Sequence, residues 1–142
     1  MSTQTTATVR VKHRFTASAE RVFDAWLDPA KARRFLFATP TGQMVRAEID
    51  PRVGGLYTFT DRRDGEDVDH TGEYLEIDRP RRLVFTFMVP KYSSVVTRVS
   101  IDIVPLESGC ELILTHEGVL KEYEEGSTQG WSRILATLAS IG

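Results

Sequence analysis

The hydrophobic period of the chain changes after Gly118, and this change limits the folds that the sequence can adopt. From Gln43 to Gly118 the apolar residues recur at every second position, which is typical of strands with one buried face. Between Trp131 and Ile141 they recur at steps of three and four, which is typical of an amphipathic helix. Strands followed by a helix indicate an α+β fold with an antiparallel sheet.

The alternating segments predict seven strands. The first covers residues 8–16, and the turns between later segments are marked by sequences such as Asp64-Gly65 and Ser108-Gly109. A sheet of this size with one apolar face needs a cover, and the C-terminal helix is the only long element that can provide it. The six later strands are expected to begin near Gln43, Leu56, Val68, Leu83, Val95 and Leu112.

Two short helices are expected after the first strand. Ser18 can cap a helix that ends at Asp28-Pro29, where Asp28 can cap a second helix reaching about Leu36. The C-terminal helix is expected from Thr128 to Ser140, with Ser127 or Thr128 as its cap.

Length and charge exclude several classes of protein. A chain of 142 residues argues for a single domain over residues 1–142, and no apolar run approaches the ~20 residues of a membrane span. The polar N-terminus does not resemble a signal peptide, and one cysteine allows no internal disulfide, so we expect a cytoplasmic protein. A net charge of -2 argues against nucleic acid as a partner. A monomer or a homodimer would fit.

Known catalytic and metal-binding motifs are absent from the sequence. It contains no phosphate-binding glycine loop, no G-x-S-x-G, no H-E-x-x-H and no pair of cysteines. The strand carboxylates of Asp102 and Glu117 fall opposite the apolar faces and give no catalytic pair. We therefore expect no metal and no cofactor.

Four stretches of the sequence carry a resemblance to a known superfamily. They are RFTA at 14–17 with VFDAW at 22–26, DPRVGG at 50–55, GEYLEI at 72–77 with RLVFTF at 82–87, and LILTHEG at 112–118 followed by Gly130-Trp131. In this order they resemble the START-like superfamily, also called SRPBCC or helix-grip, and within it the branch named after the activator of heat-shock protein 90 ATPase. The family commonly has an arginine where this chain has His13.

The resemblance implies a fold and a class of function. The fold is the helix-grip, or pollen-allergen-like, arrangement, in which a seven-stranded antiparallel sheet wraps around the C-terminal helix. Relatives use the cavity between sheet and helix for lipids, sterols or polyketides, or as an active site. The leading hypothesis is therefore a non-enzymatic domain that binds a small apolar or amphipathic molecule. The alternatives are an enzyme of the polyketide cyclase or dehydratase type and a co-chaperone-like activator of a heat-shock protein ATPase.

Two histidines are candidates for polar contacts inside such a cavity. His13 and His116 both fall on apolar strand faces by alternation. They could orient a ligand or, in the enzyme hypothesis, transfer a proton. A hydrogen-bonded structural role for each is the alternative that we favour.

Aromatic residues on the apolar faces could line the cavity or fill the core. We expect an apolar cavity between the C-terminal helix, the second short helix and the hairpin around Pro90, with Trp131 buried against the sheet. Basic doublets such as Arg62-Arg63 are expected to be solvated. The residues predicted to line the cavity, besides the two histidines, are Phe35, Phe37, Tyr57, Phe59, Phe85, Phe87, Trp131 and Leu135.

Overall fold

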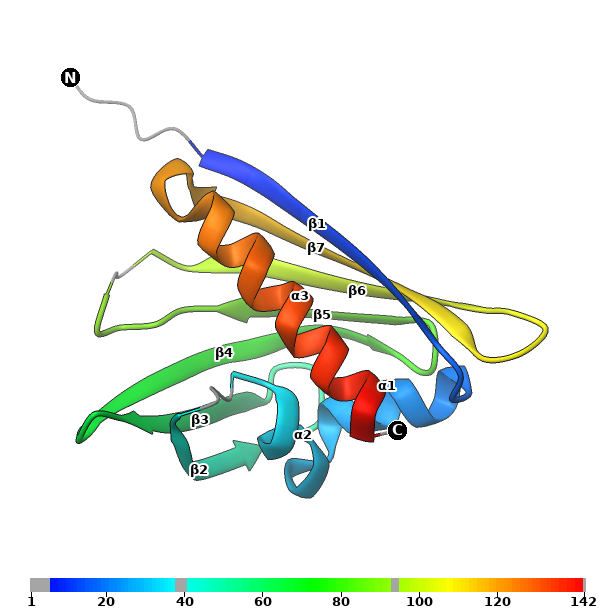
Figure 1. Cartoon of the computed structure of the whole chain (residues 1–142), viewed down its shortest axis with the longest axis horizontal. Helices are drawn as coiled ribbons and strands as arrows, with labels where there is room; N and C mark the ends of the chain where they lie inside the picture. Colours follow the sequence, from blue (N-terminus) through cyan, green and yellow to red (C-terminus); the bar gives the residue numbers. More distant parts are fainter. Residues whose placement is uncertain (1–5, 38–40, 93–94, 142) are drawn as a thin grey trace.

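The structure of the protein is a computed structural model, which describes residues 6–37, 41–92 and 95–141. A seven-stranded antiparallel sheet forms its framework (Figure 1). Every predicted strand is present, within a few residues of its expected position. The strands are β1 (Thr6–Phe15), β2 (Gln43–Ile49), β3 (Leu56–Arg63), β4 (Glu66–Asp78), β5 (Arg82–Phe87), β6 (Thr97–Pro105) and β7 (Cys110–Leu120).

The strand order across the sheet is β1-β7-β6-β5-β4-β3-β2. Strands β2 to β7 each lie beside their neighbour in sequence, so hairpin connections build most of the sheet. The first strand joins the far edge beside β7, where Val9 lies opposite His116 and His13 opposite Leu112. This arrangement confirms the predicted antiparallel sheet.

Both short helices begin at the predicted caps. Helix α1 (Ala19–Leu27) starts at Ser18, whose side chain accepts a hydrogen bond from the backbone N–H of Arg21. Helix α2 (Pro29–Phe35) starts at Asp28, whose carboxylate accepts from the N–H of Ala30. The two helices link β1 to β2 at one end of the sheet (Figure 1).

The C-terminal helix α3 (Glu124–Ile141) follows a single 3-10 turn, η1 (Lys121–Tyr123). The predicted start at Thr128 is wrong, because the helix begins four residues earlier and the Thr128 hydroxyl donates to the carbonyl of Glu124 inside it. Acidic Glu124 and Glu125 suit this early start, since negative charge stabilises a helix N-terminus. No helix within the described ranges is long and apolar enough to cross a membrane.

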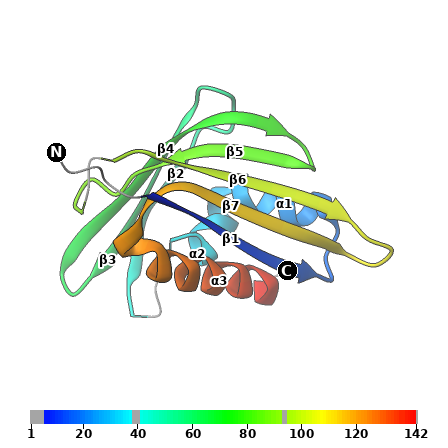
Figure 2. The same cartoon turned by 90° about the horizontal axis from the view of Figure 1, so that it is seen from above.

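Helix α3 crosses the concave face of the sheet and completes the core. Figure 2 shows it on one side of the sheet, and it packs most closely on β1. The buried side chains of this helix are Trp131, Leu135 and Leu138. Trp131 is only 4% exposed, which confirms its predicted burial. The arrangement is the helix-grip fold that the resemblance implied.

Candidate functional site

An apolar groove of about 540 Å³ opens at one end of the sheet. Its walls come from the described residues on either side of the β5–β6 connection, the end of β7, η1 and the first turn of α3. Apolar side chains make up most of the lining. The lining residues are Arg63, His70, Phe87, Met88, Val89, Tyr92, Val95, Thr97, His116, Val119, Leu120, Tyr123, Gly126 and Ser127.

A smaller hollow of about 180 Å³ adjoins the groove. It extends toward the middle of α3, and its lining is shared in part with the groove. The shared residues are Arg63, His70, Phe87, His116 and Ser127. The hollow is further lined by Phe37, Gly130, Trp131, Arg133 and Ile134.

Polar side chains on the inner face of the sheet gather at the groove. On β3 the alternation of Tyr57 and Phe59 continues to Asp61 and Arg63, so these charged residues also face inward. His70, Thr97 and His116 take equivalent inward positions on β4, β6 and β7. The opposite end of the inner face is apolar, with buried Leu83, Ile101, Ile103 and Leu112. The groove therefore joins an apolar surface to a small set of polar groups.

His116 is the centre of a directed chain of hydrogen bonds. The indole Nε1–H of Trp131 donates to Nδ1 of His116 over 3.0 Å, and an indole nitrogen can only donate. The proton of the neutral imidazole is therefore on Nε2, which lies 2.6 Å from Oγ1 of Thr97. The Thr97 hydroxyl donates in turn to the carbonyl of Phe87 at 3.0 Å. Both ring nitrogens of His116 are thus engaged within the protein.

Burial keeps His116 neutral. The residue is 3% exposed, and the loss of hydration lowers the pKa of its imidazole to about 4. A protonated ring would also place an N–H against the indole N–H of Trp131. The hydrogen-bond geometry and the lowered pKa therefore agree on the same neutral state.

His70 lies on β4 and is held in a stack of aromatic rings. Its ring is 4.7 Å from that of Phe37 and nearly parallel to it, and Phe37 stacks in turn on Phe87 at 4.9 Å. Nδ1 of His70 lies 3.2 Å from the carbonyl of Phe59, while Nε2 faces Nη2 of Arg63 at 3.5 Å. Burial lowers the pKa of His70 to about 4, and the nearby Arg63 cation acts in the same direction.

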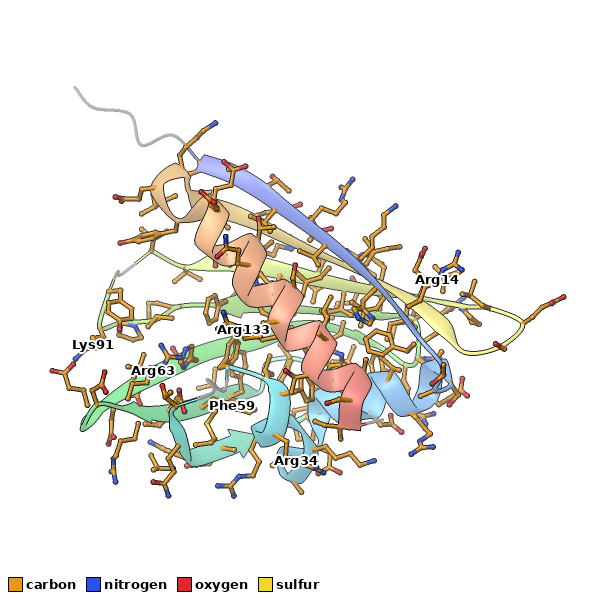
Figure 3. The ribbon with its side chains drawn as sticks, viewed as in Figure 1. Arg14, Arg34, Phe59, Arg63, Lys91 and Arg133 are labelled. Carbon is orange, nitrogen blue, oxygen red and sulfur yellow. The ribbon has the colours of Figure 1, made fainter. Side chains whose placement is uncertain are left out.

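Arg63 corrects the expectation for the basic doublets. Its neighbour Arg62 is solvated and pairs with Asp67 on the outer side, as expected. The Arg63 side chain is only 30% exposed, and its Nε donates to the buried carboxylate of Asp61 over 2.7 Å. It lines both the groove and the hollow. Figure 3 shows Arg63 on the sheet and Arg133 on α3 at this side of the molecule.

Four of the ten residues predicted for the site lie at the groove or the hollow. Phe87 and His116 line both, and Phe37 and Trp131 line the hollow. Five others belong to the core and line neither space. These are Phe35, Tyr57, Phe59, Phe85 and Leu135, each at most 3% exposed.

His13 lies apart from the groove and from His116. It is half-buried, and its Nδ1 lies 2.7 Å from the carbonyl of Arg14. In the pairing of β1 with β7, His13 lies opposite Leu112, four residues before His116. Four residues of strand span about 13 Å, so the fold does not bring the two predicted histidines together.

Three polar residues at the site were missed by the sequence analysis. Arg63, His70 and Thr97 line the groove. Strand alternation is the signal that could have found them, since each shares a face with buried residues of its own strand. Among the described residues, no cluster of three or more His, Cys, Asp or Glu side chains could hold a metal ion. The polar chemistry of the site therefore consists of the partly buried Arg63, the exposed Arg133, two neutral histidines and several hydroxyl groups.

Comparisons with known proteins agree with this architecture. Protein CV1439 from Chromobacterium violaceum has a similar structure, with a TM-score of 0.85 and 26% identity over 94% of this chain and 95% of that one. SA2116 from Staphylococcus aureus, a protein of unknown function, matches with a TM-score of 0.85 and 16% identity over 97% and 94% of the two chains.

The sequence comparisons identify the family. Among curated proteins no relative of the chain is found. The sequence model for the activator of Hsp90 ATPase homolog 1-like proteins matches residues 16–142. The chain therefore belongs to the family of activator of Hsp90 ATPase homolog 1-like proteins, within the START-like superfamily.

Proposed function

We propose that the protein binds a small apolar or amphipathic molecule in the groove between sheet and helix. The observation that carries the proposal is the open groove of about 540 Å³ with its mainly apolar lining. Volumes of roughly 300–1,000 Å³ with a few placed polar groups are typical of small-molecule sites. Membership of the family supports a ligand-binding or activator-like domain in general terms.

Two glycines in α3 support the proposal. Gly126 lines the groove and Gly130 the hollow, and a Cβ atom at either would meet nothing within 4 Å. Packing therefore does not require glycine at these positions. Glycine inside a helix costs about 1 kcal/mol relative to alanine. The missing side chains keep the space beside the helix open, which is what a ligand site needs.

The hydrogen-bonded state of His116 favours binding over acid–base catalysis. A general base needs a free nitrogen within reach of a substrate proton. Both nitrogens of His116 are engaged by Trp131 and Thr97. In this arrangement the histidine positions helix α3 over the sheet. An activator-like role would use an exposed surface instead, and substitutions in the groove would leave it unchanged.

Binding of the neutral dye Nile red tests the proposal. Phe87→Glu places a charge in the apolar lining, so we expect it to abolish the gain in dye fluorescence seen with the wild-type protein. Leu75→Glu is the matched control, because Leu75 is an exposed strand residue that lines neither space. Equal dye binding by both variants, at equal folded content by circular dichroism, would contradict the proposal. Mass spectrometry of the native protein would reveal any molecule that it retains.

The cytoplasmic location, the single-domain organisation and the monomeric or homodimeric state stay predictions from the sequence. Gel filtration coupled to light scattering would test the oligomeric state directly.

A further inference from the structure

The charged side chains that line the groove and the hollow are arginines. Arg63 lines the groove and the hollow, and Arg133 lines the hollow. No Asp or Glu from the described parts of the chain lines either space. This contrasts with the sequence as a whole, whose net charge is -2. The charged side chains exposed in the two spaces are therefore cationic although the protein as a whole is acidic, and the carboxylate of Asp61 lies beside one of them.

The guanidinium of Arg63 is fixed in position before any ligand arrives. Its Nε donates to Asp61, and its Nη2 lies 3.4 Å from the carbonyl of Phe37 and 3.5 Å from Nε2 of His70. Within residues 6–37, 41–92 and 95–141, its Nη1 has no hydrogen-bond partner. A planar guanidinium that is held on one edge keeps its other N–H groups available for an anion.

The balance of charge favours an anion with a single negative charge. The buried carboxylate of Asp61 compensates one of the two arginines, which leaves about one positive charge at the hollow. The two histidines add none, because burial lowers the pKa of each to about 4. Lys91, on the nearby hairpin, pairs with Glu66 over 3.1 Å and lines neither space.

The aromatic stack lies between the charged end of the groove and its apolar end. His70, Phe37 and Phe87 present flat faces beside Arg63. Beyond them the groove continues along apolar side chains such as Val119 and Leu120. A ligand with one anionic end and an apolar body would match both parts.

We propose that the groove selects an amphipathic carboxylate, whose carboxyl group binds Arg63 and whose apolar body fills the groove. Arg133 on α3 supplies the second cation at the hollow. Hydrogen bonds between arginine and a carboxylate are short and strong, and they are stronger still where water is partly excluded. This inference rests on the proposed function, since it names the chemistry of the same site.

Competition between two ligands of equal length tests the inference. Dodecanoate and dodecan-1-ol share an apolar chain and differ in charge, and each can displace Nile red at pH 8. We expect the wild-type protein to bind the carboxylate at least about tenfold more tightly than the alcohol, as a charged hydrogen bond implies. The preference should shrink as salt is raised from about 50 to 500 mM.

A double variant isolates the contribution of Arg63. Arg63→Gln together with Asp61→Asn removes the cation and the carboxylate that it binds, so the net charge is unchanged, and we expect the two ligands then to bind about equally. The matched control is Arg62→Gln with Asp67→Asn, which removes an ion pair one residue away on the outer side of the sheet. We expect it to keep the wild-type preference. Circular dichroism and thermal melts establish that each variant is folded.

The results separate this inference from the proposed function. If the wild-type protein binds dye and alcohol but does not prefer the carboxylate, the inference fails and the proposed function stands. If the double variant keeps the preference, Arg63 is not the anchor. If Nile red does not bind at all, both fail. Should the double variant not fold, Arg133→Gln provides the second test, because Arg133 is exposed and its loss should weaken the preference about threefold.

Discussion

Trp131 on α3 donates its indole N–H to Nδ1 of His116 on β7 over 3.0 Å, inside the protein. This bond joins helix α3 to the sheet at the inner wall of the groove. Because the Nε2–H of His116 donates in turn to the hydroxyl of Thr97, one chain of hydrogen bonds links α3, β7 and β6. The hydrogen bonds therefore restrict the rotation of α3 about its own axis, in addition to the apolar packing that holds the helix against the sheet.

Two substitutions at Trp131 separate the hydrogen bond from the packing. Trp131→Phe keeps an aromatic ring but removes the donor, so Nδ1 of His116 is left buried without its partner. We expect a loss of about 1–3 kcal/mol in the free energy of unfolding. Trp131→Ala also removes the packing and should cost about 3–5 kcal/mol. Urea denaturation measures both, and a Phe variant as stable as the wild type would show that the bond contributes nothing.

Acid should destabilise the protein through its two buried histidines. Burial lowers the pKa of His70 and of His116 to about 4 in the folded state, against about 6.5 when unfolded. Between these pH values the unfolded chain binds more protons than the folded one, so stability is full above about pH 6.5 and falls as the pH drops toward 4. The loss at pH 5 should be about 2 kcal/mol for each histidine.

Unfolding by urea at pH 7.5 and at pH 5 measures this loss. His116→Gln removes one of the two titrating groups and should remove about half of the pH-dependent loss. NMR titration of the imidazole protons gives an independent reading of each pKa. A folded-state pKa near 6.5 for either ring would contradict the prediction for that residue.

A methyl group at Gly72 should be destabilising, whereas one at Gly130 should not. A Cβ at Gly72 would collide with the carbonyl of Thr86 and lie 2.6 Å from the hydroxyl of Tyr57, which donates to that same carbonyl. Gly72→Ala should therefore cost about 1–3 kcal/mol from overpacking. Gly130→Ala meets no neighbour within 4 Å and should stabilise helix α3 by up to about 1 kcal/mol. Thermal melts that rank the two variants in the opposite order would refute this assignment.

The strands and the short helices could be predicted because their signals are local. Alternation marks a strand wherever one face is buried, and Ser18 and Asp28 cap their helices through contacts two or three residues away. Helix α3 starts without a side-chain cap among the described residues, and the acidic residues Glu124 and Glu125 are its main local signal. Its first turn continues from η1, whereas the apolar stripe begins only at Trp131 and the nearest residues before it that can cap a helix are Ser127 and Thr128, which is why the predicted start is too late.

The candidate site could be predicted only in part, because alternation gives the face of a residue but not what covers it. Phe59 and Phe87 are both on inward faces, yet only Phe87 borders the groove. The difference depends on the curvature of the sheet and the path of α3, which are long-range properties. Arg63 was missed for a related reason, since its burial depends on its pairing with Asp61.

Filling the hollow from the helix side should separate ligand binding from stability. Gly130 lines the hollow, and a side chain there would extend into open space, so Gly130→Leu should reduce the volume available to a ligand. The same change raises helix propensity by about 0.8 kcal/mol, so the variant should melt at or above the wild-type temperature. We expect it to lose most of the Nile red fluorescence while remaining folded. Ala136→Leu is the matched control, because Ala136 is exposed on the same helix and lines neither space. Unchanged dye binding by Gly130→Leu would show that bound molecules do not reach the hollow and are held in the outer groove alone.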